Sequence, residues 1–253
     1  MTSAIIVAAG GGIRMKGKIR KQYFSIKGRS VVEHTLLVFD RCKSITTIIL
    51  VIPEEDFEYC QKQILLPLGL KKEIHLVPGG KERQDSVYNG LLAVDHKDGV
   101  VVIHDGVRPN IHHDDITACI NGAMDHGACI LGVPAYDTLK RVSDGGFIEE
   151  TIKRDPIWLA QTPQAFQYEL IMKAHKRARM DGFSGTDDSV LVERLGEKVK
   201  IIEGSRYNIK ITTQEDLGFA KAILFHHPLD PLVRDTEHAE SESYRESGDA
   251  DSL

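Results

Sequence analysis

The stretch AIIVAAGGGIRMKGKIRKQY, residues 4–23, joins an apolar run, three consecutive glycines and a cluster of basic residues. The apolar run is typical of a buried strand, and a glycine turn after a strand lets backbone N–H groups approach an anion closely. Basic residues beyond such a turn could bind a polyanion, although a solvated surface loop has the same composition. The stretch predicts a strand that ends at a candidate phosphate site.

Apolar, β-branched runs alternate with amphipathic segments along most of the chain. Continuous apolar runs indicate strands covered on both faces, so the alternation predicts an α/β fold with a doubly wound, mostly parallel sheet sandwich. In such sheets the ligand lies beyond the carboxyl ends of the strands. The predicted strands are 4–9, 45–53, 73–80, 99–106, 129–135 and 198–204, and the predicted helices are 30–42, 55–68, 83–95, 113–127 and 168–182.

The composition is that of an ordinary globular protein, with 42% hydrophobic and 27% charged residues. A net charge of −5 argues against a general nucleic-acid-binding protein. No apolar run reaches the ~20 residues of a membrane span, and the first strand begins too early to leave room for a signal peptide. The four cysteines lack metal-ligand spacing, so we expect reduced thiols and a cytoplasmic location, with no membrane partner.

Two segments depart from the alternation. Residues 137–155 have two polar arms around the turn sequence SDGG at 143–146, which predicts a β-hairpin that projects from the core. A second subunit would stabilise such an arm most simply, so we expect a homodimer formed through it. Residues 226–253 contain eight acidic residues and two arginines, which predicts a disordered acidic tail after a single domain of residues 1–225.

Two common phosphate motifs do not fit the glycine turn. A P-loop needs a lysine and a hydroxyl residue after a spaced pair of glycines, and that pattern is absent here. A dinucleotide fingerprint needs a third glycine where this chain has Met15. What remains is a glycine turn followed by Arg14 and Lys21, whose charges could neutralise a reacting phosphate.

Seven short motifs between residues 4 and 224 together resemble one enzyme family. They are AAGGGIRM, RKQY, PGGKERQDSV, HDGVRP, DTLKR, QTPQAF and NIKIT, in this order. This set is similar to that of the 2-C-methyl-D-erythritol 4-phosphate cytidylyltransferases, which act in non-mevalonate isoprenoid synthesis and share the fold of the sugar-nucleotide pyrophosphorylases. The resemblance implies transfer of a cytidylyl group from CTP to methylerythritol phosphate, with release of pyrophosphate and no covalent protein intermediate.

The resemblance also implies roles for individual residues. Asp105 ends the most apolar strand and is the candidate ligand of Mg²⁺ or another divalent cation, which binds carboxylates together with phosphate oxygens. Without the motif, an aspartate there would be interpreted as a turn cap. The implied catalytic cations are Arg14, Lys21 and Lys210, the implied CTP-binding residues are Ala8, Ala9, Gly10, Gly79, Gly80 and Ser86, and the implied acceptor-binding residues are Arg108, Thr138, Arg154, Thr162 and Thr186.

The chain departs from the family pattern at a few positions. Lys81 stands where many members have an acidic residue, and Gly106 and Val107 replace a common pair of alanines. Thr138 and Arg154 lie on opposite arms of the predicted hairpin, and in the family this arm reaches into the site of the neighbouring subunit. The first departure changes the charge of the loop that is implied to contact the base, and we expect the second to be tolerated.

Three other functions remain open at this stage. Ribitol 5-phosphate cytidylyltransferases share the CTP-side motifs, although the sequence RDPIWLAQTPQAF is closer to the methylerythritol enzymes. A pyridine-nucleotide oxidoreductase is disfavoured by the missing third glycine. A non-catalytic nucleotide-binding protein on the same fold would be expected to lose Arg14, Lys21 or Lys210, and all three are present.

Overall fold

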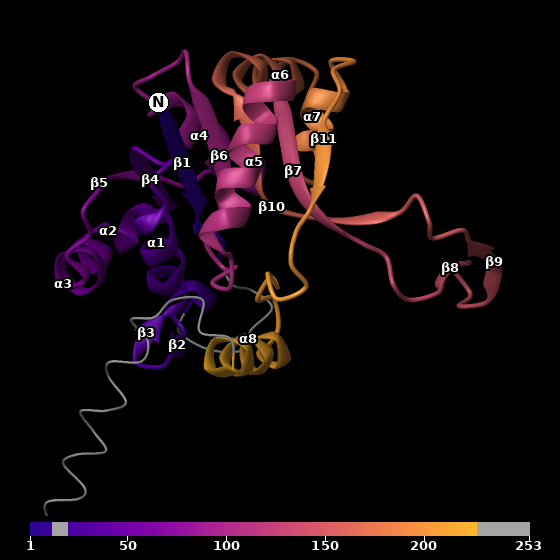
Figure 1. Cartoon of the computed structure of the whole chain (residues 1–253), viewed down its shortest axis with the longest axis horizontal. Coiled ribbons are helices and arrows are strands. Elements are labelled where there is room, and N and C mark those ends of the chain that lie inside the picture. The colour runs from indigo at the N-terminus through magenta and orange to yellow at the C-terminus, as the bar shows by residue number, and fades with distance from the viewer. Residues whose placement is uncertain (12–19, 227–253) are drawn as a thin grey trace, which may run out of the picture.

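The computed structural model describes residues 1–11 and 20–226, and a seven-stranded sheet with helices on both faces forms its body (Figure 1). The strand order is β11-β7-β10-β6-β1-β4-β5, and every neighbouring pair is parallel except the two that involve β10. This confirms the predicted doubly wound, mostly parallel sheet. The strands are β1 (Thr2–Val7), β4 (Thr47–Ile52), β5 (Glu73–Pro78), β6 (Val100–Asp105), β7 (Ala128–Pro134), β10 (Trp158–Gln167) and β11 (Lys200–Glu203).

Strand β10 is the main element that the sequence analysis does not assign. It runs antiparallel between β6 and β7, so Gln164 is paired with Ile103 on one side and Ile130 on the other. Proline removes a ladder hydrogen bond and argues against a central strand. The register shifts between Ala160 and Gln164, and this irregularity accommodates Pro163 within the sheet.

The helices follow the predicted segments within a few residues, except that 55–68 is a run of short helical pieces and the last two helices were not predicted. They are α1 (Val31–Arg41), α2 (Phe57–Cys60), α3 (Leu66–Leu68), α4 (Arg83–Leu92), α5 (His113–His126), α6 (Tyr168–Met180), α7 (Ser189–Glu193) and α8 (Gln214–His226), with the short turns η1 (Lys21–Tyr23), η2 (Glu54–Asp56) and η3 (Gln61–Leu65). None of the helices within the described ranges is long and apolar enough to cross a membrane.

The central strands β1 and β6 are buried along their whole length, and successive side chains enter the cores on opposite faces of the sheet. In β1, Ala4 and Ile6 pack with α1 and α5, whereas Ile5 and Val7 pack with α4 and α6. A third cluster joins α8 to the first turn of α1 and to Ile26, which belongs to the short hairpin of β2 (Ser25–Ile26) and β3 (Arg29–Ser30). The polar residues treated below therefore gather where the apolar strands end.

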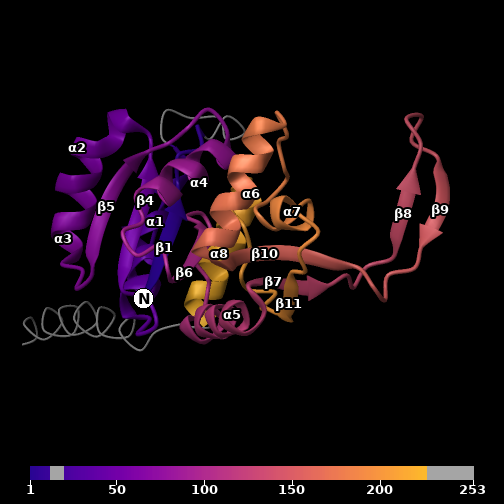
Figure 2. The same ribbon diagram turned by 90° about the horizontal axis from the view of Figure 1, so that it is seen from above.

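A second antiparallel hairpin, β8 (Leu139–Val142) with β9 (Ile148–Ile152), projects far from the body in both views (Figures 1 and 2). This confirms the predicted projecting arm. Near its turn Phe147 is 78% exposed and Ile148 is 64% exposed, which leaves apolar surface on the arm. The acidic tail lies outside the described residues apart from the end of α8, so its predicted disorder stays a prediction.

Candidate active site

A cavity of about 340 Å³ opens at the carboxyl ends of β1 and β6. A second cavity of about 210 Å³ adjoins it toward β10. Three side chains line both cavities, namely Arg83, Asp105 and Lys210. The site therefore has two compartments with a charged junction, at the edge of the sheet where α/β folds bind ligands.

Two loops in close contact form the wall of the first cavity. A Cβ atom added to Gly79 would lie 2.3 Å from the Cβ of Ala9, so only glycine lets the loop after β5 pack against the loop after β1. The N–H of Gly80 donates to Oγ of Ser86 at 3.0 Å, and that hydroxyl donates to the carbonyl of Glu82 at 3.1 Å. These contacts hold exposed backbone of the glycine loops beside the cavity.

Two predicted cations, Lys21 and Lys210, line the first cavity. Lys21 begins η1, which is held against the end of β1 because the buried amide of Gln22 donates to the carbonyl of Ala8 at 2.7 Å. Lys210 is held by its neighbours, since the Asn208 amide donates to the carbonyl of Thr162 at 2.7 Å and the N–H of Ile211 donates to the carbonyl of Val107 at 2.9 Å. The fold thus brings together two cations that are far apart in the sequence.

The carboxylate of Asp105 lies at the junction and is surrounded by positive charge. Its Oδ1 accepts from Arg83 Nε at 2.9 Å, and its Oδ2 lies 2.8 Å from Lys210 Nζ and 3.7 Å from Arg108 Nε. Burial alone would raise the pKa of this carboxyl, but the three cations outweigh burial and hold the pKa well below its usual range. Asp105 is therefore an anion throughout the physiological pH range.

A buried histidine supports the backbone of this aspartate. The hydroxyl of Thr162 accepts from the N–H of Asp105 and lies 3.1 Å from Nδ1 of His104. The carbonyl of Arg108 lies 3.2 Å from Nε2 of His104, so Nε2 bears the proton and Nδ1 accepts from Thr162. Burial lowers the pKa of His104 to about 3, which keeps the ring neutral.

This pKa predicts acid sensitivity of the fold. Because His104 binds a proton in the unfolded chain near pH 6.5 but not in the folded chain, the free energy of unfolding should fall as pH decreases, by about 1 kcal/mol per pH unit from this group. Denaturant unfolding between pH 6 and 5 measures this slope. In a His104→Asn variant the unfolding free energy should depend less steeply on pH than in wild type. Equal pH dependence in the two proteins would contradict a neutral His104 in the folded state.

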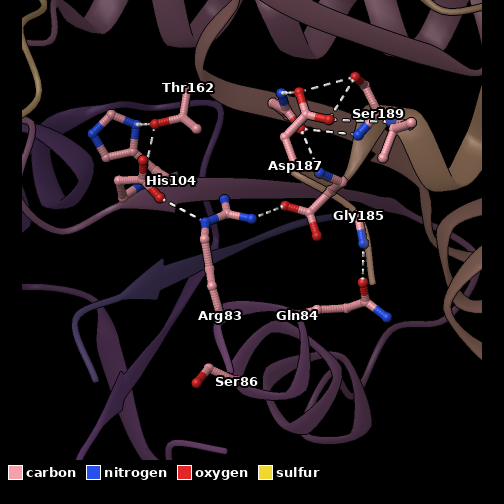
Figure 3. A network of polar contacts seen from close by, with 12 residues as sticks. Arg83, Gln84, Ser86, His104, Thr162, Gly185, Asp187 and Ser189 are labelled. Carbon is pink, nitrogen blue, oxygen red and sulfur yellow. Dashed lines mark hydrogen bonds and ion pairs between the residues drawn. The ribbon is translucent and has the colours of Figure 1, made fainter. Parts of the chain in front are cut away.

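An ion network that the sequence analysis missed extends from the junction (Figure 3). Arg83 Nη1 donates to Asp188 Oδ2 at 2.8 Å, and the side-chain oxygen of Gln84 accepts from the N–H of Gly185 at 2.9 Å. The first turn of α4 is thereby tied to the loop that contains Thr186. Arg83 and Asp188 are separated by 105 residues, and no local pattern in the sequence signals their pairing.

Most, but not all, of the predicted site residues meet here. Gly79, Thr138 and Arg154 line neither cavity; Gly79 packs against Ala9 instead, and Arg154 donates to the carbonyl of Tyr136 at the base of the arm. Arg14 lies outside the described residues. The first cavity is lined by Ala8, Ala9, Gly10, Lys21, Gly80, Ser86, Asp105 and Lys210, and the second by Asp105, Arg108, Thr162, Thr186 and Lys210.

Comparison with known proteins points to a single family. A family model described as 2-C-methyl-D-erythritol 4-phosphate cytidylyltransferase matches residues 2–226. The protein of that name from Pelotomaculum thermopropionicum is 46% identical over 222 residues, which cover 88% of this chain and 93% of that protein. The one from Syntrophus aciditrophicus is 48% identical over 221 residues, which cover 87% and 94%.

Structural similarity agrees with the sequence matches. The crystal structure of 4-diphosphocytidyl-2C-methyl-D-erythritol synthase from Anaerococcus prevotii has a TM-score of 0.79 and 39% identity, with 89% of this chain and 96% of that chain covered. The chain therefore belongs to the 2-C-methyl-D-erythritol 4-phosphate cytidylyltransferase family.

Proposed function

We propose that this chain transfers the cytidylyl group of CTP to 2-C-methyl-D-erythritol 4-phosphate, which gives 4-diphosphocytidyl-2-C-methyl-D-erythritol and pyrophosphate. The observation that supports this most directly is the two-compartment site, in which glycine loops and lysines face one cavity and Arg108 and hydroxyl groups face the other. The first compartment suits a nucleoside triphosphate, and the second suits a phosphorylated polyol.

The reaction is an in-line displacement at phosphorus. A phosphate oxygen of the acceptor forms a bond to the α-phosphorus of CTP while the bond to the bridging oxygen breaks, and that electron pair leaves with pyrophosphate. Such chemistry depends on positioning and on charge neutralisation. Lys21 and Lys210 would contact the reacting phosphates, and the loops at Gly10 and Gly80 would hold the nucleotide. Arg14 would join them.

We also propose Mg²⁺, or another divalent cation, as the cofactor, with Asp105 as its ligand. Asp105 is the one carboxylate among the three side chains that both cavities share, and Mg²⁺ commonly binds one or two carboxylates together with substrate phosphates. Lys210 Nζ occupies Oδ2 at 2.8 Å and would have to release it. When bound, the cation would neutralise charge on the triphosphate.

We further propose a homodimer in which Thr138 and Arg154 act on the acceptor in the neighbouring subunit. The projecting arm and its exposed Phe147 support this, because Thr138 and Arg154 line neither of the two site cavities in the described part of their own subunit. A cytoplasmic location is proposed with it, since all four cysteines are free thiols.

Sharing of sites between subunits predicts complementation. Lys21→Ala and Arg154→Ala homodimers should each be nearly inactive, because every site lacks one of the two groups. Subunits mixed after dissociation should recover about a quarter of wild-type activity, since each mixed dimer contains one intact site. Each variant refolded alone is the control. No recovery, together with monomers in sizing chromatography, would rule out the shared site.

Pyrophosphate release tests the proposed function. The full chain is incubated with CTP, Mg²⁺ and either methylerythritol 4-phosphate or ribitol 5-phosphate. We expect release with the first acceptor and its loss when EDTA removes the metal. Release with ribitol 5-phosphate alone would reassign the acceptor. No pyrophosphate release with either acceptor would favour a non-catalytic nucleotide-binding protein.

A further inference from the structure

Behind the junction lies a buried pair that no step of the proposed reaction uses. Asp188, at the start of α7, is 1% exposed, and His175, in α6, is fully buried. Nε2 of His175 lies 3.1 Å from Oδ1 of Asp188. Because the other oxygen of Asp188 accepts a hydrogen bond from Arg83, the Asp188–His175 pair holds the guanidinium in place.

Arg83 itself is the first residue of α4 and lines both cavities. It bridges two carboxylates, with Nε on Asp105 at 2.9 Å and Nη1 on Asp188 at 2.8 Å. Its remaining nitrogen, Nη2, is buried and has no hydrogen-bond partner among the residues that the structure describes. One donor nitrogen of the guanidinium is therefore left over at the junction between the two compartments.

The loop that contains Asp188 is fixed on its other side by β10. The N–H groups of Asp188 and Ser189 both donate to the side-chain oxygen of Gln164, at 3.1 and 3.2 Å, and Gln164 donates to Asp187 at 2.7 Å. Asp188 is therefore a rigid anchor. A buried ion network contributes little stability relative to apolar packing of the same volume, which favours an orienting role for this one.

We infer that the Asp188–His175 pair positions Arg83, and that Arg83 in turn fixes the nucleotide compartment relative to the acceptor compartment. The inference rests on the proposed function for its kinetic consequences. If the anchor is lost, the guanidinium turns toward Asp105 alone, and the acceptor loop keeps its link to the first turn of α4 only through Gln84. A misplacement of about 1 Å at such a point costs ~10²-fold in rate.

The kinetic test uses Asp188→Asn, which keeps the shape and removes the charge. We expect kcat to fall ~10–100-fold and KM for the acceptor to rise, while KM for CTP stays within about threefold, because the glycine loops do not contact Asp188. Asp181→Asn is the matched control, since Asp181 pairs with Arg177 and Arg194 and not with Arg83. Its constants should equal those of wild type.

A second pair of variants separates orientation from stability. His175→Gln retains an N–H donor for Asp188 and should keep most of kcat, whereas His175→Met fills the space without a donor and should resemble Asp188→Asn. Melting temperatures are recorded for all variants. Unchanged kcat and acceptor KM in Asp188→Asn and His175→Met, or equal losses in both His175 variants, would overturn the inference.

Crystal structures of wild type and Asp188→Asn test the positioning without turnover. The guanidinium of Arg83 should shift by about 1 Å or more in the variant; an unmoved guanidinium would overturn the inference. Failure of the proposed function is recognised separately, because it appears as absent pyrophosphate release in the wild-type protein.

Discussion

A Lys21→Ala variant is expected to fold normally and to release pyrophosphate ~10²–10³ times more slowly than wild type. Lys21 lines the first cavity from η1, and its charge would meet negative charge that builds up on the triphosphate in the transition state. The loss of one such preorganised group typically costs this much in kcat. The turn should persist, because Gln22 still bonds to the carbonyl of Ala8.

The measurement is kcat from pyrophosphate release at saturating CTP and acceptor. Lys43→Ala is the matched control, since Lys43 is exposed and lines neither cavity. Its kcat should equal that of wild type. Turnover of Lys21→Ala within about threefold of wild type would refute charge neutralisation by this lysine.

An Asp105→Asn variant is expected to lose both stability and activity. Three buried or half-buried cations face this carboxylate, and its neutralisation leaves Arg108 and Lys210 without this partner while Arg83 keeps Asp188. Such a change costs about 3–5 kcal/mol of unfolding free energy. Release of pyrophosphate should fall by ~10²-fold or more, since Lys210 loses the carboxylate that holds it and Arg83 loses one of the two carboxylates that it bridges.

The stability loss has a defined pH dependence. The pKa of Asp105 in the folded protein is far below its usual value, so its contribution is complete above the unfolded pKa near 4 and disappears as pH falls further. The difference between wild type and Asp105→Asn should therefore be constant from pH 5 to 8 and narrow below about pH 4. Denaturant unfolding measures it, with Asp144→Asn in the exposed turn of the arm as the control. A difference that widens toward acid would contradict the ion network.

Local patterns predicted much of this fold. Continuous apolar runs identified β1 and β6 because both faces of those strands are buried, and the SDGG turn identified the arm. Strand β10 was not predicted because a proline such as Pro163 disfavours a central strand. Only the register shift in the sheet explains how Pro163 is accommodated there. Short helices such as α7 have too few residues for a periodic signal.

The candidate site also has one part that the sequence predicts and another part that it does not. Glycine loops and the end of β6 indicate ligand contact by their composition, and the family motifs supplied Lys21 and Lys210. The pairings that organise the site are long-range: Arg83 meets Asp105 across 22 residues and Asp188 across 105. Such contacts depend on the packing of α4 against the sheet, which sequence spacing does not encode.

The way in which the arm leaves the sheet has an evolutionary consequence. Its two ends depart from adjacent rungs, where Pro134 is paired with Trp158 and the N–H of Ala135 donates to the carbonyl of Ile157. The arm between these paired positions can therefore be exchanged, shortened or redesigned as a unit without a change in the pairing register of β7 and β10. If the arm pairs subunits as proposed, subunit pairing can diverge among relatives while the loops that line the first cavity, at the ends of other strands, stay under separate selection.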